Sequence, residues 1–274
     1  MESKLPIGIF DSGIGGITVL KVLRQHFPQE NFLYVGDTAR LPYGTKSPQT
    51  IRIYAEQIMN YLVDTGVKAI VIACNTASSQ VPEDQWRGVP VFSTIGPGAE
   101  QALAHSQSKR IGVIGTRATI ESETYPREIT KLDPSAQVWS VASPLLVPLA
   151  EEGLDSDPIT NLIVSRYCGS LLAHDIDTLI LGCTHYPLLR QSFQRVCGSS
   201  VTLVDSGEAI ALRMEKQLGL QNAMSQKQDI APTESSQGSI EICLTDYPQH
   251  HEKMIQKVLG VTSPISSRHI HLSR

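Results

Sequence analysis

The chain is predicted to be an α/β protein of two similar lobes, with mostly parallel sheets flanked by helices. Three observations predict this fold. Short runs of Val, Ile and Leu alternate with longer amphipathic segments. The short runs lack polar alternation, which is typical of parallel strands covered on both faces. Finally, a weak internal repeat relates one half of the chain to the other.

The short apolar runs are predicted to be strands. They cover residues 7–10, 32–36, 69–73, 91–93, 111–115, 138–141, 178–182, 201–204 and 240–244. The segments between them have apolar residues at helical spacing. These predicted helices cover residues 16–26, 49–66, 99–105, 122–132, 159–174, 188–196 and 208–218. Right-handed βαβ connections place the loops that carry a site at the carboxyl ends of such strands.

The C-terminal part has a different composition. Residues 222–239 are rich in Gln, Ser and Ala, which indicates a surface loop or linker. A strand at 240–244 and a helix at 250–259 follow it. We expect both to pack back on the first lobe.

The internal repeat concerns how the strands end. Residues 7–12 (IGIFDS) resemble residues 111–116 (IGVIGT), an offset of 104 residues, and two later strands lead into cysteines 109 residues apart. Each half therefore has a strand that ends in a hydroxyl residue and a later strand that ends in a cysteine. We predict a first lobe of residues 1–95 plus 207–274, a second lobe of residues 96–206, and an active site in the cleft between them.

Composition excludes several classes of partner. Hydrophobic residues make up 41% of the 274-residue chain, charged residues 18%, and the net charge is -4. No basic run exceeds two residues, so we expect neither nucleic acid nor an anionic membrane as a partner. No apolar stretch approaches the roughly 18 residues of a membrane helix. The N-terminus leads directly into a strand, so we expect no signal peptide and a cytoplasmic location.

Cysteine usage points to thiol chemistry. The chain has 5 cysteines and no C-x-x-C pair, which argues against a disulfide framework or a zinc ribbon. Cys168, Cys197 and Cys243 are interpreted as structural residues. Cys74 and Cys183 each follow a buried strand, so their thiols are expected to face one substrate from opposite sides. That geometry favours the transfer of a proton from one face of a carbon to the other. The reference pKa of a cysteine thiol is near 8.5, so one thiolate and one thiol can coexist near neutral pH.

A glycine-rich turn at residues 11–16 (DSGIGG) follows the first strand and opens a helix. Its free N–H groups favour an anion, although a tight turn without any ligand also fits the pattern. A dinucleotide site is the rival interpretation, because Asp37 follows the second strand. The fingerprint is incomplete, since Thr18 stands where the third glycine belongs. Residues 44–47 lack the glycine spacing of a P-loop.

In combination, the motifs resemble the glutamate racemases of the aspartate/glutamate racemase family. The segments that carry the resemblance are residues 9–16 (IFDSGIGG), 34–37 (YVGD), 42–44 (PYG), 73–77 (ACNTA), 112–116 (GVIGT), 148–153 (PLAEEG) and 182–187 (GCTHYP). The resemblance spans roughly residues 5 to 220 and weakens from about 222 onward. It implies a cofactor-independent racemase of two α/β lobes that supplies D-glutamate for peptidoglycan.

The resemblance also assigns roles. It implies that Cys74 acts on D-glutamate and Cys183 on L-glutamate, with Asp11 assisting the first thiol and His185 the second. Two further acids are implied as helpers, Asp37 and either Glu151 or its neighbour. Of the last two we name Glu151.

Substrate binding is expected to use small neutral donors rather than arginines, because a fixed cation would disturb the thiolates. The expected substrate-binding residues are Asp11, Ser12, Tyr43, Gly44, Asn75, Thr76, Thr116, Thr119, Thr184 and His185. We expect glutamate as the small-molecule partner, a homodimer, no metal and no cofactor. Most amino-acid racemases use pyridoxal phosphate on a lysine imine, and only Lys46 stands near any of the motifs.

Other functions stay open on the residues alone. Racemisation of aspartate differs by one methylene in the substrate. Related two-lobed folds include decarboxylases with one cysteine, against which the second cysteine argues. Cys74, Cys183 and His185 are also residue types that bind zinc in a metal hydrolase. A binding module for acidic metabolites needs no chemistry at all.

Overall fold

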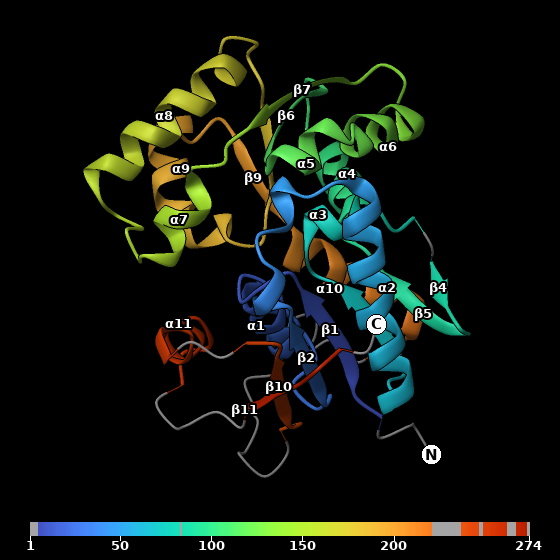
Figure 1. The fold of residues 1–274 in the computed structure, drawn as a ribbon. Helices are drawn as coiled ribbons and strands as arrows, with labels where there is room; N and C mark the ends of the chain where they lie inside the picture. Colours follow the sequence, from blue (N-terminus) through green and yellow to red (C-terminus); the bar gives the residue numbers. More distant parts are fainter. Residues whose placement is uncertain (1–4, 83, 221–236, 247–248, 262–266, 273–274) are drawn as a thin grey trace.

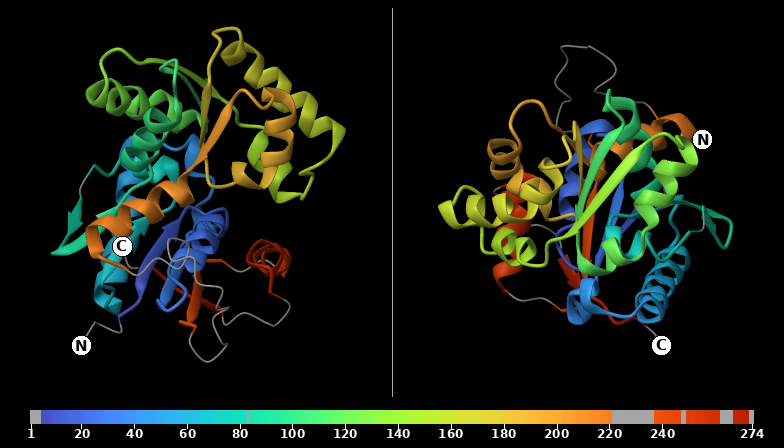
Figure 2. Two further views of the ribbon diagram at one scale, coloured as in Figure 1. Left: turned by 180° about the vertical axis from the view of Figure 1, so that it is seen from behind. Right: turned by 90° about the horizontal axis from the view of Figure 1, so that it is seen from above.

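A computed structural model describes residues 5–82, 84–220, 237–246, 249–261 and 267–272. These residues form two sheets in two tiers, both flanked by helices (Figures 1 and 2). The two-lobed α/β fold with mostly parallel sheets is thereby confirmed. Most of the loop predicted at 222–239 lies outside the described residues.

The first sheet, in the lower part of Figure 1, has the strand order β11-β10-β2-β1-β3-β5-β4. All neighbours are parallel except β4 and β5. The strands are β1 (Ile7–Asp11), β2 (Phe32–Gly36), β3 (Ala69–Ile72), β4 (Gln85–Trp86), β5 (Val89–Phe92), β10 (Ile240–Leu244) and β11 (Ser267–His269). The short strands β4 and β11 were not predicted, because two or three residues carry no readable pattern.

The second sheet is fully parallel, with the order β7-β6-β8-β9. Its strands are β6 (Arg110–Gly115), β7 (Gln137–Ala142), β8 (Thr178–Gly182) and β9 (Thr202–Asp205). Here β6 pairs with β8, just as β1 pairs with β3 in the first sheet. The repeat predicted one strand of each kind in each half, and the pairing shows that the cysteine strand lies directly beside the strand that ends in a hydroxyl or acidic residue.

Eleven α-helices and three short 3-10 helices connect the strands within the described residues. The α-helices are α1 (Ile17–His26), α2 (Pro48–Thr65), α3 (Asn75–Ser78), α4 (Ile95–His105), α5 (Arg117–Glu121), α6 (Thr124–Leu132), α7 (Leu146–Glu151), α8 (Pro158–Leu172), α9 (Arg190–Cys197), α10 (Ser206–Leu218) and α11 (Gln249–Leu259). The 3-10 helices are η1 (Thr38–Arg40), η2 (Tyr43–Thr45) and η3 (Tyr186–Leu189). The long helices match their predicted segments, whereas α3, α5 and α7 are too short to show a helical period.

The central strands of each sheet are buried on both faces, which explains their unbroken apolar runs. In the first sheet Ile9 and Val71 belong to the core cluster on one face, while Phe10 and Ile72 belong to that on the other. Burying such a side chain stabilises the fold by about 1.5–3 kcal/mol. The carboxyl ends of the strands are therefore held on a rigid base. Among the described helices, none is long and apolar enough to cross a membrane.

The C-terminal elements return to the first sheet, as expected. Strand β10 pairs with β2, and helix α11 packs against α1. Ile255 of α11 lies in the core cluster of the first sheet. The predicted lobe boundaries fall at the first residues of α4 and α10, helices that pack on each other. The division of the chain at 95/96 and 206/207 stays a prediction.

Candidate active site

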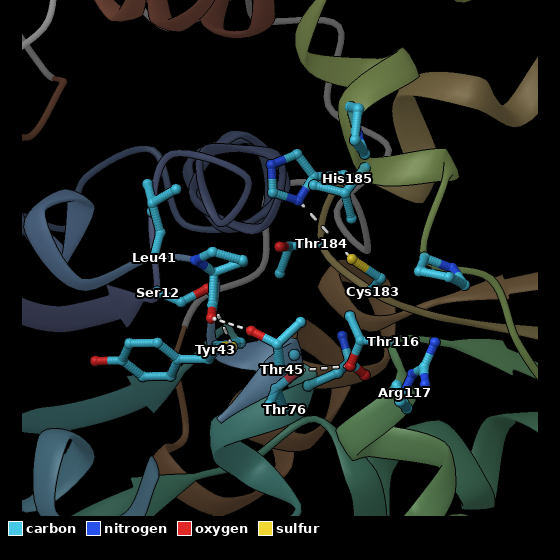
Figure 3. A pocket seen from close by; sticks show the side chains of 18 of the residues that line it. Ser12, Leu41, Tyr43, Thr45, Thr76, Thr116, Arg117, Cys183, Thr184 and His185 are labelled. Carbon is cyan, nitrogen blue, oxygen red and sulfur yellow. Dashed lines mark hydrogen bonds between the residues drawn. The ribbon is translucent and has the colours of Figure 1, made fainter. Parts of the chain in front are cut away.

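A cavity of about 540 Å³ opens where the strand ends of the two sheets meet. Residues from both tiers line it, and Figure 3 shows them facing a common space. The cavity brings together most of the residues that the sequence predicted. These are Ser12, Tyr43, Gly44, Cys74, Asn75, Thr76, Thr116, Glu151, Cys183, Thr184 and His185. Three predicted residues do not line it, namely Asp11, Asp37 and Thr119.

Asp11 ends β1 and is fully buried behind the cavity. Its Oδ2 accepts hydrogen bonds from the backbone N–H groups of Gly13 and Gly16, at 3.2 and 3.1 Å. The anion that the glycine-rich turn holds is therefore the chain's own carboxylate. Thr184 of the other tier donates to Oδ1 at 3.4 Å. Burial raises the pKa of Asp11, against the opposing charge of His185 and the two backbone donors.

Cys74 follows β3 and forms the N-cap of α3, where its Sγ accepts the Ala77 N–H at 3.4 Å. The thiol lies 3.6 Å from Ser12 Oγ. Burial, and then the charge of Asp11, raise the pKa of Cys74 to about 12. At neutral pH this sulfur therefore carries its proton.

Cys183 follows β8, and its Sγ lies 3.8 Å from His185 Nδ1 (Figure 3). The separation of two residues between His185 and Cys183 suggests an extended segment with both side chains on one side. The segment is not extended, because the chain turns after Gly182 and His185 caps η3 with helical backbone angles. The turn still brings the ring to the thiol.

His185 connects Cys183 to an acid. Its Nε2 lies 3.1 Å from Oε1 of Glu151 at the end of α7. Burial by itself lowers the pKa of His185, but the contacts with Cys183 and Glu151 and the charge of Asp11 raise it to about 10. The ring is thus an imidazolium at neutral pH. Of the two adjacent acids, Glu151 contacts the histidine and lines the cavity. Both acids line a separate pocket against α11, but Glu152 does not line the active-site cavity.

Three threonine hydroxyls join the two tiers at another side of the cavity. Thr76 Oγ1 lies 2.8 Å from Thr116 Oγ1 and 3.2 Å from Thr119 Oγ1. Thr119 is buried behind the other two and does not reach the cavity. Gly44 closes the cavity against Thr116, since a Cβ on this glycine would lie 2.9 Å from the threonine Cβ. Only glycine fits there without displacing the threonine.

Asp37 is correctly placed after β2 but lies away from the cavity. Its carboxylate accepts from Arg40 Nε at 2.7 Å, from Thr245 Oγ1 at 3.0 Å, and from the Tyr43 hydroxyl. The ring of Tyr43 points away from the cavity, so that only its backbone side faces inward (Figure 3). Asp37 therefore anchors the segment that carries Tyr43 and Gly44 rather than touching a substrate.

The cavity lining contains one arginine besides the small neutral donors that the sequence predicted. Arg117, the first residue of α5, lines the cavity with an exposed side chain. Arg117 was not predicted as a site residue, although it directly follows Thr116, the hydroxyl residue at the end of β6. The other lining residues that it missed are Gly13, Leu41, Pro42, Thr45, Pro144, Val147 and Pro148. Most are apolar and carry no chemical signature.

Within the described residues no three His, Cys, Asp or Glu side chains are placed to share a metal ion. Cys74, Cys183 and His185 therefore do not form the zinc site considered from the sequence. The described lining of the cavity likewise contains no lysine for an imine.

Comparison with known proteins identifies the family. A family model described as Asp/Glu/Hydantoin racemase matches residues 18–214, more than half of the chain. The chain belongs to this racemase family. A curated relative, the glutamate racemase of Syntrophus aciditrophicus, is 42% identical over 261 residues, covering 94% of each chain.

Solved structures agree with this membership in the racemase family. A glutamate racemase isoform from Bacillus anthracis matches with a TM-score of 0.87 at 31% identity and covers 98% of both chains. The glutamate racemase of Francisella tularensis in complex with D-glutamate matches with a TM-score of 0.85 at 33% identity, again over 98% of both chains. The resemblance inferred from the sequence motifs is confirmed.

Proposed function

We propose that this chain is a glutamate racemase that moves the α-proton of glutamate between two cysteines without a cofactor. The observation that carries the proposal is that Cys74 and Cys183, from two different sheets, line one amino-acid-sized cavity. The names of its relatives support glutamate as the substrate. An isomerase of this kind needs a base on one face of the α-carbon and an acid on the other.

From L-glutamate, the proposed reaction begins at Cys183. Its thiolate removes the α-proton, forming an S–H bond, and the electron pair of the broken C–H bond stays on the substrate as a carbanion. His185, an imidazolium 3.8 Å away, shares its proton with this sulfur and balances charge. Glu151 holds the ring in place through Nε2.

The second step takes place on the other face. Cys74 donates its proton to the carbanion, a C–H bond forms, and the product is D-glutamate with the charge left on Cys74. Its high pKa, about 12, makes the thiol the resting form there. The reverse reaction starts with Cys74 as the base, with Asp11 behind it as the group that accepts a proton from the thiol.

Substrate carboxylates are proposed to bind the small donors around the thiols. The donors are Ser12, the backbone at Tyr43 and Gly44, Asn75, Thr76, Thr116, Thr184 and His185, with Thr119 supporting Thr116. Arg117 adds a positive charge at the same cavity. We further propose that the enzyme works as a cytoplasmic homodimer and supplies D-glutamate for peptidoglycan.

The test compares single variants of the two cysteines. Cys74→Ala and Cys183→Ala are each expected to reduce racemisation by about 10³-fold or more, because one proton relay is lost. The measurement is loss of circular dichroism from L- and from D-glutamate in D₂O, with α-deuterium counted by NMR. Aspartate is run in parallel as a rival substrate.

Cys197→Ala is the matched control, since this thiol is also buried but lies outside the cavity. It is expected to racemise at the wild-type rate. Near-normal turnover by either cavity variant in both directions would refute the two-cysteine scheme. Faster turnover of aspartate than of glutamate would change the proposed substrate.

A further inference from the structure

Tyr125 is buried beneath the cavity without lining it. It lies in the first turn of α6, is 1% exposed, and packs in a core cluster of the second sheet. Its hydroxyl donates a 2.7 Å hydrogen bond to Oδ1 of Asn75, which follows β3 of the first sheet. Burial raises the pKa of Tyr125, so the phenol keeps its proton and remains a donor.

The side-chain amide of Asn75 is held from two directions. Besides Tyr125, the hydroxyl of Ser206 at the start of α10 lies 3.1 Å from Nδ2 and 3.3 Å from Oδ1. The oxygen of the amide is therefore engaged by two hydroxyl groups. The side-chain nitrogen of Asn75 carries two N–H groups, and one of them donates to a described acceptor, Ser206 Oγ. Asn75 is 1% exposed and lines the cavity next to Cys74.

The orientation of an amide decides what it can recognise. With the oxygen engaged inside, Asn75 can offer the cavity only an N–H donor, which suits a carboxylate. A half-turn about the last side-chain torsion would present the oxygen instead, which suits an ammonium group. The hydrogen bond from Tyr125 opposes that half-turn. It also ties the tier that carries Cys74 to the tier that carries Cys183.

We propose that Tyr125 is a positioning residue that fixes the Asn75 amide with its N–H toward the substrate carboxylate. The inference rests on the proposed function, since it concerns the binding of glutamate in the same cavity. Tyr125 touches no substrate and acts through Asn75. It therefore affects how tightly glutamate is held more than the proton transfers at the two sulfurs.

The first experiment measures kcat and KM for L- and D-glutamate in Tyr125→Phe. The ring is retained and only the hydroxyl is lost, so we expect KM to rise by about three- to tenfold, with a smaller change in kcat. Tyr61→Phe is the control, because this hydroxyl on α2 also has hydrogen-bond partners but lies outside the cavity. It should leave KM unchanged. An unchanged KM in Tyr125→Phe would overturn the inference, as would a loss confined to kcat.

A double-mutant cycle separates positioning from general structural damage. If Tyr125 acts through Asn75, Tyr125→Phe has no further effect on KM in an Asn75→Ala background. An equal rise in both backgrounds contradicts the inference. Should Tyr125→Phe fail to fold, Ser206→Ala replaces it in the same cycle, with the same expected loss of effect. A wild-type chain without racemase activity overturns the proposed function and this inference together, whereas an active wild type with an unresponsive KM overturns this inference alone.

Discussion

The two cysteines occupy equivalent places in the two sheets, yet their surroundings are opposite in charge. Cys74 follows β3 and lies near the carboxylate of Asp11. Burial, and then the charge of Asp11, raise the pKa of this thiol. Cys183 follows β8 and lies against His185, an imidazolium held by Glu151. The repeated fold therefore supplies two thiols, and the residues beside them make the two thiols different.

This difference bears on how a symmetric reaction can run on an asymmetric enzyme. The raised pKa of Cys74, about 12, keeps a proton on this sulfur at rest, and in the proposed mechanism that proton serves one face of the substrate. On the other side, the imidazolium of His185 lies 3.8 Å from Cys183 Sγ and supplies a positive charge beside that sulfur. In the proposed mechanism this resting arrangement takes a proton from L-glutamate, and the product state, with the negative charge on Cys74, runs the reverse reaction.

After loss of a cysteine itself, the largest expected effects come from removing the acid or the histidine beside one cysteine at a time. Asp11→Asn and His185→Asn should each lower kcat by about 10²- to 10³-fold, because each leaves one thiol without its partner. The two variants should differ in which proton removal becomes slow. Asp11→Asn should increase the primary isotope effect from D-[2-²H]glutamate, and His185→Asn that from L-[2-²H]glutamate.

The isotope effects decide whether the comparison holds. Equal increases from both enantiomers in both variants would mean that the helpers are not assigned to separate thiols. A reversed pattern would exchange the two assignments. The wild type, measured with both deuterated enantiomers, provides the reference.

The next expected effect concerns the contact between the glycine-rich turn of the first tier and the segment that carries His185 in the second tier. A Cβ on Gly15 would lie 2.4 Å from His185 Cε1 and 2.6 Å from Thr184 Oγ1. Gly15→Ala should therefore displace the histidine from Cys183, lowering kcat by about tenfold or more and stability by about 1–3 kcal/mol. Gly169→Ala is the control, since nothing lies within 4 Å of its added Cβ on α8. This variant should be slightly more stable and fully active. A fully active Gly15→Ala enzyme would show that the contact between the two sides is dispensable.

A smaller effect, on the pH dependence of activity, tests the role of His185 beside Cys183. Because the contact with Glu151 raises the pKa of His185, Glu151→Gln should lower that pKa. Activity that needs the imidazolium is present below the pKa, about 10, and is lost as the pH rises through it. The basic limb of the pH–rate profile should move down by roughly one pH unit or less, since Glu151 is 38% exposed and partly screened by solvent.

Glu152→Gln tests the specificity of this effect. The residue adjoins Glu151 but makes no contact with His185. Its basic limb should coincide with that of the wild type, and an equal shift in both variants would mean a general charge effect. The contribution of His185 to folding stability depends on pH in the same direction as the activity does. Because its pKa is raised in the folded protein, this contribution is fully present below about pH 6.5 and is lost as the pH rises to about 10.

The residues at the strand ends could be predicted from the sequence. Which of their side chains face the cavity could not be predicted. Cys74 and Cys183 follow from apolar runs that stop at a thiol, and parallel pairing brings such ends to one edge. Asp37 met the same criterion but lies behind Tyr43, because η1 and η2 fold over it. Whether a residue after a strand faces the cavity depends on the conformation of the loop that follows. Such a loop has no hydrophobic periodicity from which its conformation could be predicted.

The specific partners in long-range contacts could not be predicted, even where the lobe on which a segment packs was expected. The pairing of β10 with β2 joins segments about 200 residues apart, and local patterns carry no record of such a neighbour. The same holds for the hydrogen bond between Tyr125 and Asn75. Glu151 and Glu152 could be separated only by the geometry at the end of α7, since adjacent helical residues differ by about 100° in direction.

The smallest expected effect should be equal for the Cys74 side and the Cys183 side of the cavity. It therefore tests for a contribution to binding that does not distinguish the two enantiomers. Arg117 lies at the cavity with an exposed side chain and, in the described part of the chain, no ion pair. Glutamate carries two carboxylates, so Arg117→Ala should raise KM by roughly two- to fivefold for both enantiomers alike, and added salt should reduce the difference from wild type. Arg117→Lys should keep most of the attraction, and Arg166→Ala, an exposed arginine on α8 away from the cavity, should have no effect. A KM change in one enantiomer only would place this cation on one side of the substrate and not at a shared entrance.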